Sequence, residues 1–313
     1  MSQLKALVDK LLGGVSNGYF PTGMISEKIL TPVTVKQSSG KIGKYGLAHL
    51  RILSTIMGGK GEAKRIEIRQ MDSTAYFVEP HGLHEIITPE EYANVEDPFD
   101  IEKDVTEQLT SLLFMAKEKG LADTLRDTAI ITQTSTLSGT SQWSDYASGV
   151  SDPFQDAALA KKTVRAGCGA VVDTVIMDYD VAEVLRGHPK LVRSLGFADN
   201  RAGTLTDQEL AKALGVRRVL IADVMYNSSK PGQADVLASL WGKDVIFAVA
   251  PEKATKAQKT LGYMVTLAGQ APRKVYKSDV DNPPESKKIV VKDSYDMVLV
   301  DVKCAYLFKN AIA

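Results

Sequence analysis

Cysteine is scarce in this chain, and its scarcity limits the chemistry that the chain can perform. The 313 residues include only two cysteines, Cys168 and Cys304, and neither belongs to a C-x-x-C pair. The spacing therefore predicts neither a zinc site nor a disulfide framework, and two free thiols fit a reducing cytoplasm. A chain of this length can bury a sizeable core without such links.

Histidine is also rare, which leaves one candidate for a metal site. Of the four histidines, only His81 and His84 have a spacing that could hold a metal, and Glu85 follows them. Pro80 and Gly82 would interrupt the helix that such a pair needs, and a third ligand is missing. We interpret these residues as polar loop residues and expect no metal.

Net charge and long apolar runs are absent as well. The chain has 38 basic and 38 acidic residues, so its formal net charge is zero. This balance argues against a dedicated nucleic-acid binder, although it allows a protein whose inner face lies near nucleic acid. It also removes one barrier to self-association. No apolar run approaches the ~18 residues that a membrane span needs, and we expect no membrane partner.

The motifs of common enzyme classes do not occur. The sequence has no G-x-S-x-G elbow and no G-x-x-x-x-G-K-[ST] phosphate loop. The segment Gly167–Gly169 resembles half of a dinucleotide fingerprint, but it follows a predicted helix and precedes a predicted strand, which is the reverse order. We therefore predict no catalytic residue and no cofactor, and we do not expect an enzyme.

The clearest positive feature is a long helix over residues 100–127, with Asp100 as its cap. Its length predicts a rod of roughly 35–40 Å, which could act as a spine across a whole domain. Its predicted apolar stripe, at helical spacing, consists of Ile101, Val105, Leu109, Leu112 and Ala116.

The chain before this helix has less regular patterns. Leu4 to Leu12 have the spacing of a short amphipathic helix, which Gly13-Gly14 would end. Residues 15–47 show little periodicity apart from a strand at Thr31–Lys36, and we expect an extended arm that lies on another surface. Residues 50–71 alternate around Gly58-Gly59-Lys60-Gly61, which predicts a long β-hairpin with a glycine-rich tip.

The chain after the long helix alternates between short helices and strands. Helices are predicted at 154–165, 181–195 with a break at Pro189, and 205–214. Strands are predicted at 171–177, 218–225, 237–241, 245–249 and 263–267, and a terminal hairpin within 296–308.

One of the two tryptophans, Trp143, lies in the polar, turn-rich segment Leu137–Asp156 between these two regions. No reactive groups surround it. We expect a fixed structural junction in which Trp143 is a buried anchor and Asp152-Pro153 begins the next helix.

Several phrases in this order resemble the major capsid proteins of tailed bacteriophages, which have the HK97-like fold. They include LSGTSQWSDYASGVSDPFQD at 137–156, VAEVLRGHPKLV at 181–192, ELAKALGVRRVLIADVMYN at 209–227 and LWGKDVIFAVAP at 240–251. With the segment 76–104, the resemblance covers roughly residues 70–270. A Pro-Asn pair that such coat proteins often carry is replaced here by Ala170 to Asp173.

The resemblance implies an α+β fold with a definite division of the chain. Residues 1–47 would be an N-terminal arm, 48–75 an E-loop hairpin, and 76–165 a P-domain with its spine helix at 100–127. Residues 166–286 would be an A-domain, and 287–313 would return to the P-domain.

The resemblance also implies where copies of the chain meet. Contacts between subunits are expected in the E-loop at Gly58, Gly59, Lys60, Gly61, Arg65 and Arg69. An A-domain loop is expected near the symmetry axes, although a plain exposed loop is an equally good interpretation; it consists of Asn227, Ser228, Ser229, Lys230, Pro231 and Gly232. Some such capsids cross-link a lysine to an asparagine. Lys60, Lys64 and Asn310 are candidates here, but ordinary surface residues are the better interpretation.

The expected function is a coat protein that self-assembles, as pentamers and hexamers, into an icosahedral head around double-stranded DNA. Its location would be the virion, after assembly in the host cytoplasm. Because the arm begins almost at once, the expected partners are a separate scaffolding protein or none, a portal and a decoration protein. The alternatives are an encapsulin-like compartment that encloses proteins, and a cytoplasmic α/β enzyme.

Overall fold

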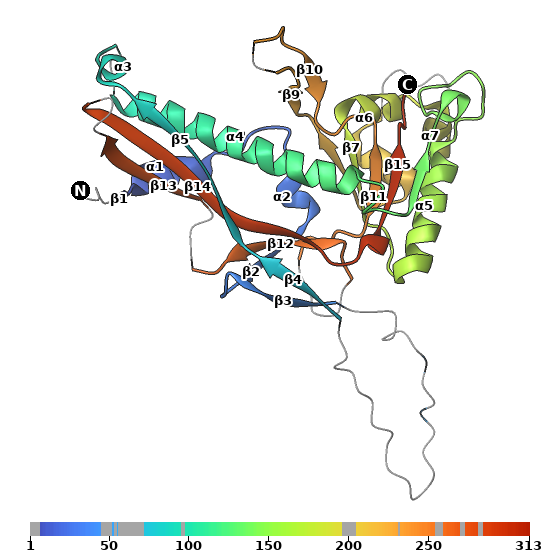
Figure 1. Cartoon of the computed structure of the whole chain (residues 1–313). Helices are drawn as coiled ribbons and strands as arrows, with labels where there is room; N and C mark the ends of the chain where they lie inside the picture. The colour runs from blue at the N-terminus through green and yellow to red at the C-terminus, as the bar shows by residue number, and fades with distance from the viewer. Residues whose placement is uncertain are drawn as a thin grey trace, which may run out of the picture.

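The computed structural model of the protein describes residues 7–44, 52, 55, 72–94, 98–195, 205–230, 232–253, 259–269, 273–280 and 284–313. Figure 1 shows an elongated part, built on a long helix and a large sheet, and a compact part at one end that carries most of the shorter helices. The predicted hairpin over 50–71 lies outside the described residues.

A six-stranded sheet forms the elongated part. Its central strand, β14 (Ser286–Leu299), pairs along one edge with both β12 (Gly262–Leu267) and β13 (Arg273–Val280), and along the other with β5 (Glu79–Ile87). Two further strands extend it: β1 (Leu7–Val8) pairs with β13, and β2 (Thr31–Val35) runs parallel to β12. A separate two-stranded ribbon joins β3 (Ser39–Lys44) to β4 (Asp72–Phe77).

The spine helix α4 (Pro98–Arg126) and α1 (Lys10–Gly18) cover one face of this sheet. Leu12 of α1, Leu109 and Leu113 of α4, and Ile289 of β14 form the core between the layers. The short helix α3 (Pro89–Ala93) lies near the amino-terminal end of α4, and α2 (Ser26–Ile29) lies against its carboxyl-terminal half, beside Lys117 and Glu118. No described helix is both long enough and apolar enough to cross a bilayer.

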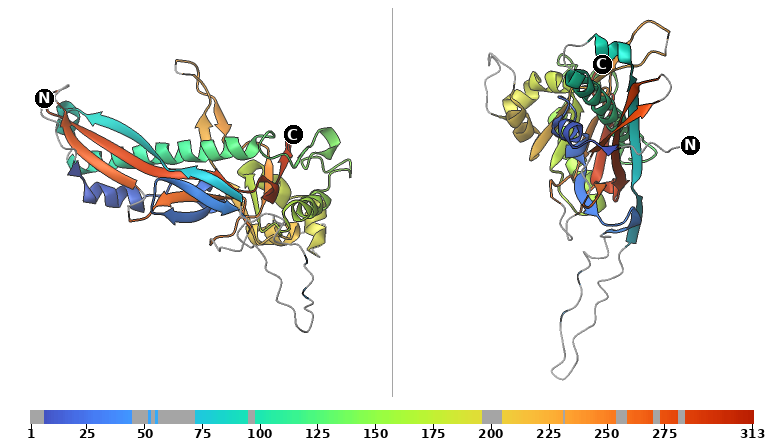
Figure 2. Two further views of the ribbon diagram at one scale, coloured as in Figure 1. Left: turned by 60° about the horizontal axis from the view of Figure 1, so that its bottom comes forward. Right: turned by 90° about the vertical axis from the view of Figure 1, so that its left-hand side faces the viewer.

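The compact part contains a five-stranded sheet. Its strand order is β6 (Thr134–Thr136), β15 (Ala305–Lys309), β11 (Val245–Ala248), β7 (Thr174–Asp178) and β8 (Arg218–Ala222). Four helices surround it: α5 (Pro153–Cys168), α6 (Tyr179–Arg186), α7 (Pro189–Ser194) and α8 (Asp207–Leu214). A small hairpin of β9 (Met225–Asn227) and β10 (Leu237–Ser239) projects from it, as Figure 2 shows.

The amino-terminal prediction is wrong in two respects. The helix begins at Lys10, because the Asp9 carboxylate accepts hydrogen bonds from the backbone of Leu11 and Leu12, and it continues through Gly13-Gly14. Residues 15–44 are not an unstructured arm: they contain α2, β2 and β3, and Met24, Ile25, Ile29 and Leu30 are buried in this same subunit. Burial against α4 and the sheet outweighs the low helix propensity of the two glycines.

The spine helix has the predicted length but a different buried face. It begins at Pro98, so Asp100 lies inside the helix and is not its cap. Leu112 is 51% exposed and Ala116 is exposed. The buried face instead includes polar side chains, namely Glu102, Thr106, Thr110, Lys117 and Glu118. These residues have partners within the fold, so an apolar pattern alone places the face incorrectly.

Two further predictions on strands are wrong. His81 and His84 lie on β5 and not in a loop, and a separation of three residues along a strand puts them on opposite faces. The chain also has no terminal hairpin within 296–308, because β14 belongs to the six-stranded sheet and β15 to the five-stranded sheet. The strand β13 has no counterpart among the predicted elements.

The predicted division into domains does not follow these sheets. β12 and β13 fall in the predicted A-domain but pair with β14, and α5 falls in the predicted P-domain but packs on β11 and β15. β15 also pairs away from the sheet to which it was expected to return. The long strand β14 accounts for the first of these departures, because it pairs with both β12 and β13.

Glu118 joins three segments of the fold at its centre. Its buried carboxylate accepts hydrogen bonds from the Trp241 indole at 2.7 Å and from the backbone N–H of Ser26 at 2.7 Å. The backbone N–H of Ile25 donates to the same carboxylate. One side chain of α4 therefore holds both the amino-terminal segment and the compact part.

Replacing this carboxylate tests how much it contributes to the stability of the fold. Glu118→Ala leaves three buried donors unpaired, and we expect it to lower the free energy of unfolding by about 3–5 kcal/mol. Asp123→Ala, an exposed position on the same helix, should change it by less than about 1 kcal/mol. Denaturant unfolding measures both, and equal stability of the two variants would contradict the role given to Glu118.

Candidate assembly surfaces and their supporting junction

Trp143 is the buried centre of the segment that leads from the spine helix into the compact part. Its side chain is fully buried, and its indole N–H donates to the Asp156 carboxylate at 2.8 Å. Its backbone N–H donates to the carbonyl of Ala311 at 2.7 Å, and its ring lies 5.5 Å from that of Phe308. The segment 137–156 is thus attached both to α5 and to the carboxyl terminus of the chain.

Burial raises the pKa of Asp156, and the hydrogen bond from Trp143 opposes that rise. Asp152 begins α5 as expected, because its carboxylate accepts from the backbone of Gln155 and Pro153 occupies the first turn. The predicted junction therefore has the geometry of an anchor.

Shortening the anchor should impair folding. Trp143→Ala removes a fully buried ring, and we expect a loss of about 3–5 kcal/mol in the free energy of unfolding. Trp143→Phe keeps an aromatic ring but loses the hydrogen bond to Asp156, so its loss should be smaller. Thermal unfolding compares the two variants, and a Trp143→Ala protein with wild-type stability would show that the ring is dispensable.

Among the described histidines, His188 is the one whose ring contacts a serine hydroxyl, that of Ser151. Its Nε2 lies 3.1 Å from the Ser151 hydroxyl, and its Nδ1 accepts from the backbone N–H of Lys190. The imidazole is only 2% exposed, as is Ser151, so a substrate has no access to the pair. The imidazole acts as the cap of α7, and this contact gives no support for an enzyme.

The titration of His188 makes stability depend on pH. Burial, with a smaller effect from Lys190, lowers its pKa from 6.5 to about 4. Between these values the unfolded chain binds a proton that the folded chain does not, so this part of the stability is full above pH 6.5 and is lost as the pH falls towards 4. His188→Gln should flatten the decline measured by thermal unfolding across this range, and an unchanged decline would assign it to other groups.

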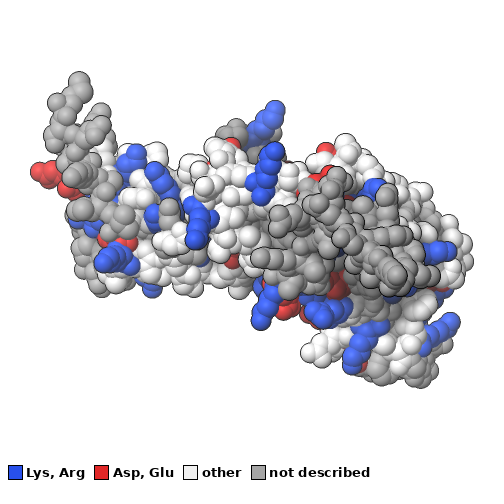
Figure 3. Space-filling view, turned by 90° about the horizontal axis from the view of Figure 1, so that it is seen from below, with Lys and Arg blue, Asp and Glu red and all other residues white. Residues whose placement is uncertain are grey.

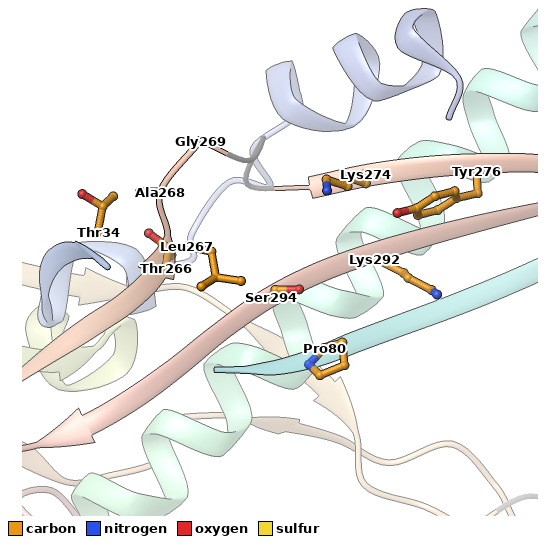
Figure 4. Close-up of a pocket in the computed structure, with 10 residues that line it drawn as sticks. All are labelled: Thr34, Pro80, Thr266, Leu267, Ala268, Gly269, Lys274, Tyr276, Lys292 and Ser294. Carbon is orange, nitrogen blue, oxygen red and sulfur yellow. The ribbon is translucent and has the colours of Figure 1, made fainter. Parts of the chain in front are cut away.

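A hollow of about 420 Å³ lies on the six-stranded sheet, at the break where β12 ends and β13 begins (Figure 4). Lys274, Lys292 and Tyr276 line it together with the hydroxyl groups of Thr34, Thr266 and Ser294. The described residues that line it include no histidine, cysteine or carboxylate that could activate these hydroxyl groups. Among the described residues no group of three metal-binding side chains occurs either.

The predicted A-domain loop lies at the end of the β9–β10 hairpin. The Asn227 side chain shapes it, because its oxygen accepts from the backbone N–H groups of Ser229 and Val236 and its amide donates to Asp235. Pro231 lies outside the described residues, while Lys230 and Gly232 are exposed. Sequence reasoning missed the apolar side chains beside this loop: Met225, Val236 and Leu237 are 50%, 55% and 69% exposed.

The predicted E-loop contacts cannot be placed in the same way. Gly58, Gly59, Lys60, Gly61, Arg65 and Arg69 all lie outside the described residues, as does Lys64. Asn310, the other candidate for a cross-link, has a backbone N–H that donates to Asp244 and a carbonyl that accepts from Gln142.

Comparison with known proteins gives full-length relatives. No protein-family profile matches the chain. The chain is 26% identical over its full length to the major capsid protein of Pseudomonas phage JBD67, and the match covers all of that protein as well. It is 23% identical to the major capsid protein of Burkholderia phage BcepMu, over 86% of each chain. The chain is thus similar over its full length to a phage major capsid protein.

Solved structures agree on an HK97-like fold. A phage-related protein from Bordetella bronchiseptica matches 98% of this chain and 98% of its own, with 20% identity and a TM-score of 0.73. The capsid of cyanophage P-SCSP1u matches 95% of this chain and 90% of its own, with 12% identity and a TM-score of 0.57. An encapsulin from Synechococcus elongatus also shares the fold, covering 97% and 96% at 9% identity with a TM-score of 0.52.

The fold alone therefore does not separate a phage head from an encapsulin compartment. The two relatives in sequence, one matched over its full length and one over 86%, favour a phage head, because both are phage major capsid proteins. The chain is accordingly a structural component of the virion, and it forms the phage head shell.

Proposed function

We propose that copies of this capsid protein assemble as pentamers and hexamers into an icosahedral head that encloses double-stranded DNA. The full-length match to phage major capsid proteins carries this proposal. Contacts between unlike surfaces of identical subunits can close into rings and shells. In this assignment the partners are a portal, a decoration protein and a separate scaffolding protein.

The two sheets provide a basis for assigning the P-domain and the A-domain. We assign the P-domain to the six-stranded sheet with α4, and the A-domain to the five-stranded sheet with α5 to α8. The elongated P-domain would span the distance between capsomer centres, and the compact A-domain would gather around the symmetry axes. The residues predicted for the E-loop, Gly58 to Gly61 with Arg65 and Arg69, keep their proposed role on a neighbouring subunit.

The β9–β10 hairpin supports an axial contact for the loop 227–232. A two-stranded hairpin is at best marginally stable by itself in water, and this one exposes Met225, Val236 and Leu237. Its opposite face is anchored, since Lys119 of α4 lies 5.8 Å from the Tyr226 ring. Contact with the same hairpin of neighbouring copies would bury the exposed apolar side chains.

Electron microscopy of the purified protein tests the proposal. We expect uniform hollow particles from the wild-type chain, and a chain that stays monomeric under all assembly conditions would contradict it. Particles that carry DNA from the host cell would favour a phage head, whereas particles filled with one enzyme would favour an encapsulin-like compartment.

A variant tests the axial contact within the same experiment. Leu237→Asp places a charge in the proposed contact, and we expect it to reduce the yield of particles at least about tenfold, since a buried unpaired charge costs several kcal/mol. Val150→Asp, at an exposed loop position, is the matched control. Equal particle yields from both variants would remove the hairpin from the contact.

A further inference from the structure

The carboxyl end of α5 carries a dense group of cations. Lys161, Lys162 and Arg165 lie within two turns of the helix and line a shallow hollow of about 550 Å³. Among the described residues, Ala166 and Val171 also line it, and Val171 is 67% exposed. None of the described residues that line it is a carboxylate.

Two further exposed cations lie in the segment that adjoins this end of α5. The Lys161 ammonium donates a hydrogen bond to the carbonyl of Leu214 at 2.7 Å, which brings α5 against the end of α8. Lys212 precedes that carbonyl by two residues and Arg217 follows it by three, and both are exposed. We call the five residues Lys161, Lys162, Arg165, Lys212 and Arg217 the basic patch.

The positive charge of this patch is not neutralised locally. None of the five cations forms an ion pair with a carboxylate of the described residues. The nearby Asp173, whose carboxylate accepts from the Thr174 hydroxyl and from the backbone N–H of Ala250, contributes one negative charge against these five positive charges. In a chain whose net charge is zero, five such cations are a pronounced local excess.

We propose that the basic patch lies on the inner surface of the shell and binds the phosphate groups of the enclosed double-stranded DNA. The proposal rests on the proposed function, because it assumes a shell that encloses DNA. Figure 3 views the molecule from below, the side at which α5 ends, and shows Lys and Arg side chains projecting over this end of the compact part.

The composition of the patch favours DNA over a second protein surface. The cores of protein–protein interfaces are apolar and poor in lysine, whereas this hollow has three cations and two small apolar side chains. Duplex DNA carries one negative charge per ~1.7 Å of its axis, which suits cations spaced by about one helical turn, or ~5 Å. Arginine also presents a fork of donors that matches a phosphate group.

Binding of this kind would be independent of DNA sequence. Phosphate contacts position a protein on DNA but do not read its bases. The affinity of one subunit for DNA would be low, but the affinity of a whole shell would be high, because many copies would bind one DNA molecule. This agrees with a chain that has no overall basic excess and yet encloses nucleic acid.

The test measures binding of a DNA duplex to dissociated full-length protein over a range of salt concentrations. The patch variant is Lys162→Ala, Arg165→Ala and Arg217→Ala, all at exposed positions; Lys161 is kept because it supports α8. We expect the slope of log K against log salt to fall by about 2.7, and the affinity to fall on the order of 10- to 100-fold, because each phosphate contact contributes about 0.9 to the slope.

The control removes the same net charge elsewhere. Lys10→Ala, Lys288→Ala and Lys292→Ala lie in the elongated part and should leave slope and affinity nearly unchanged. Equal losses in both variants, or no salt-dependent binding by the wild-type protein, would overturn the proposal. A patch variant that binds DNA normally but no longer forms particles would identify the patch as a contact between copies, and would also overturn it.

Assembled shells give a second measurement. Closed wild-type shells should not bind, through this patch, a duplex too long to enter them, although dissociated protein should bind it. If closed wild-type shells bind this long duplex and shells made of the patch variant do not, the patch lies on the outer surface. That result would overturn the proposal. If the wild-type chain forms no shells at all, the proposed function fails, and that outcome is separate from the binding result.

Discussion

The fold depends on a carboxylate buried at its centre. Glu118 is fully buried and accepts from two backbone amides and from the Trp241 indole. A buried anion is costly unless hydrogen bonds satisfy it, and here each donor comes from a part of the chain that must be held against the spine. The contact brings together residues about 92 and 123 positions apart in the sequence, so it can form only when both regions are in place.

Ionic contacts extend this arrangement along the spine. Lys117, beside Glu118, pairs with Glu27 at 3.2 Å and with Asp293 at 3.7 Å, which links the amino-terminal segment to β14. Burial raises the pKa of Asp293 against the opposing effect of Lys117. Near the end of α4, Arg126 and Lys309 both bond to Asp244. Burial would raise the pKa of Asp244, but these hydrogen bonds hold it below its usual value.

Local sequence patterns predict the parts of this fold that are stabilised locally. The helix at 207–214 begins at a capping box of Thr206 and Glu209 and ends at Gly215, which adopts φ 64°, so its limits are evident in the sequence. The buried face of α4 is not evident in the sequence, because Glu118 and Lys117 are charged residues of a type usually found on the surface. Their partners become known only in the folded structure. The 14-residue β14 is predicted only in pieces, at 289–291 and from Asp296 onwards, since its charged positions, such as Lys292, interrupt the apolar pattern. The exposed apolar side chains of the β9–β10 hairpin become apparent only once the hairpin is seen to project.

The course of β14 has a mechanical consequence. It ends at Leu299, and the five residues that follow lead directly to β15 in the other sheet, with Cys304 fully buried at that crossing. A connection of five residues, with Val300 and Cys304 buried at its two ends, leaves little room for a hinge at this crossing. The two sheets should therefore turn as one stiff lever, and a change in shell curvature would tilt whole subunits against each other rather than bend each one.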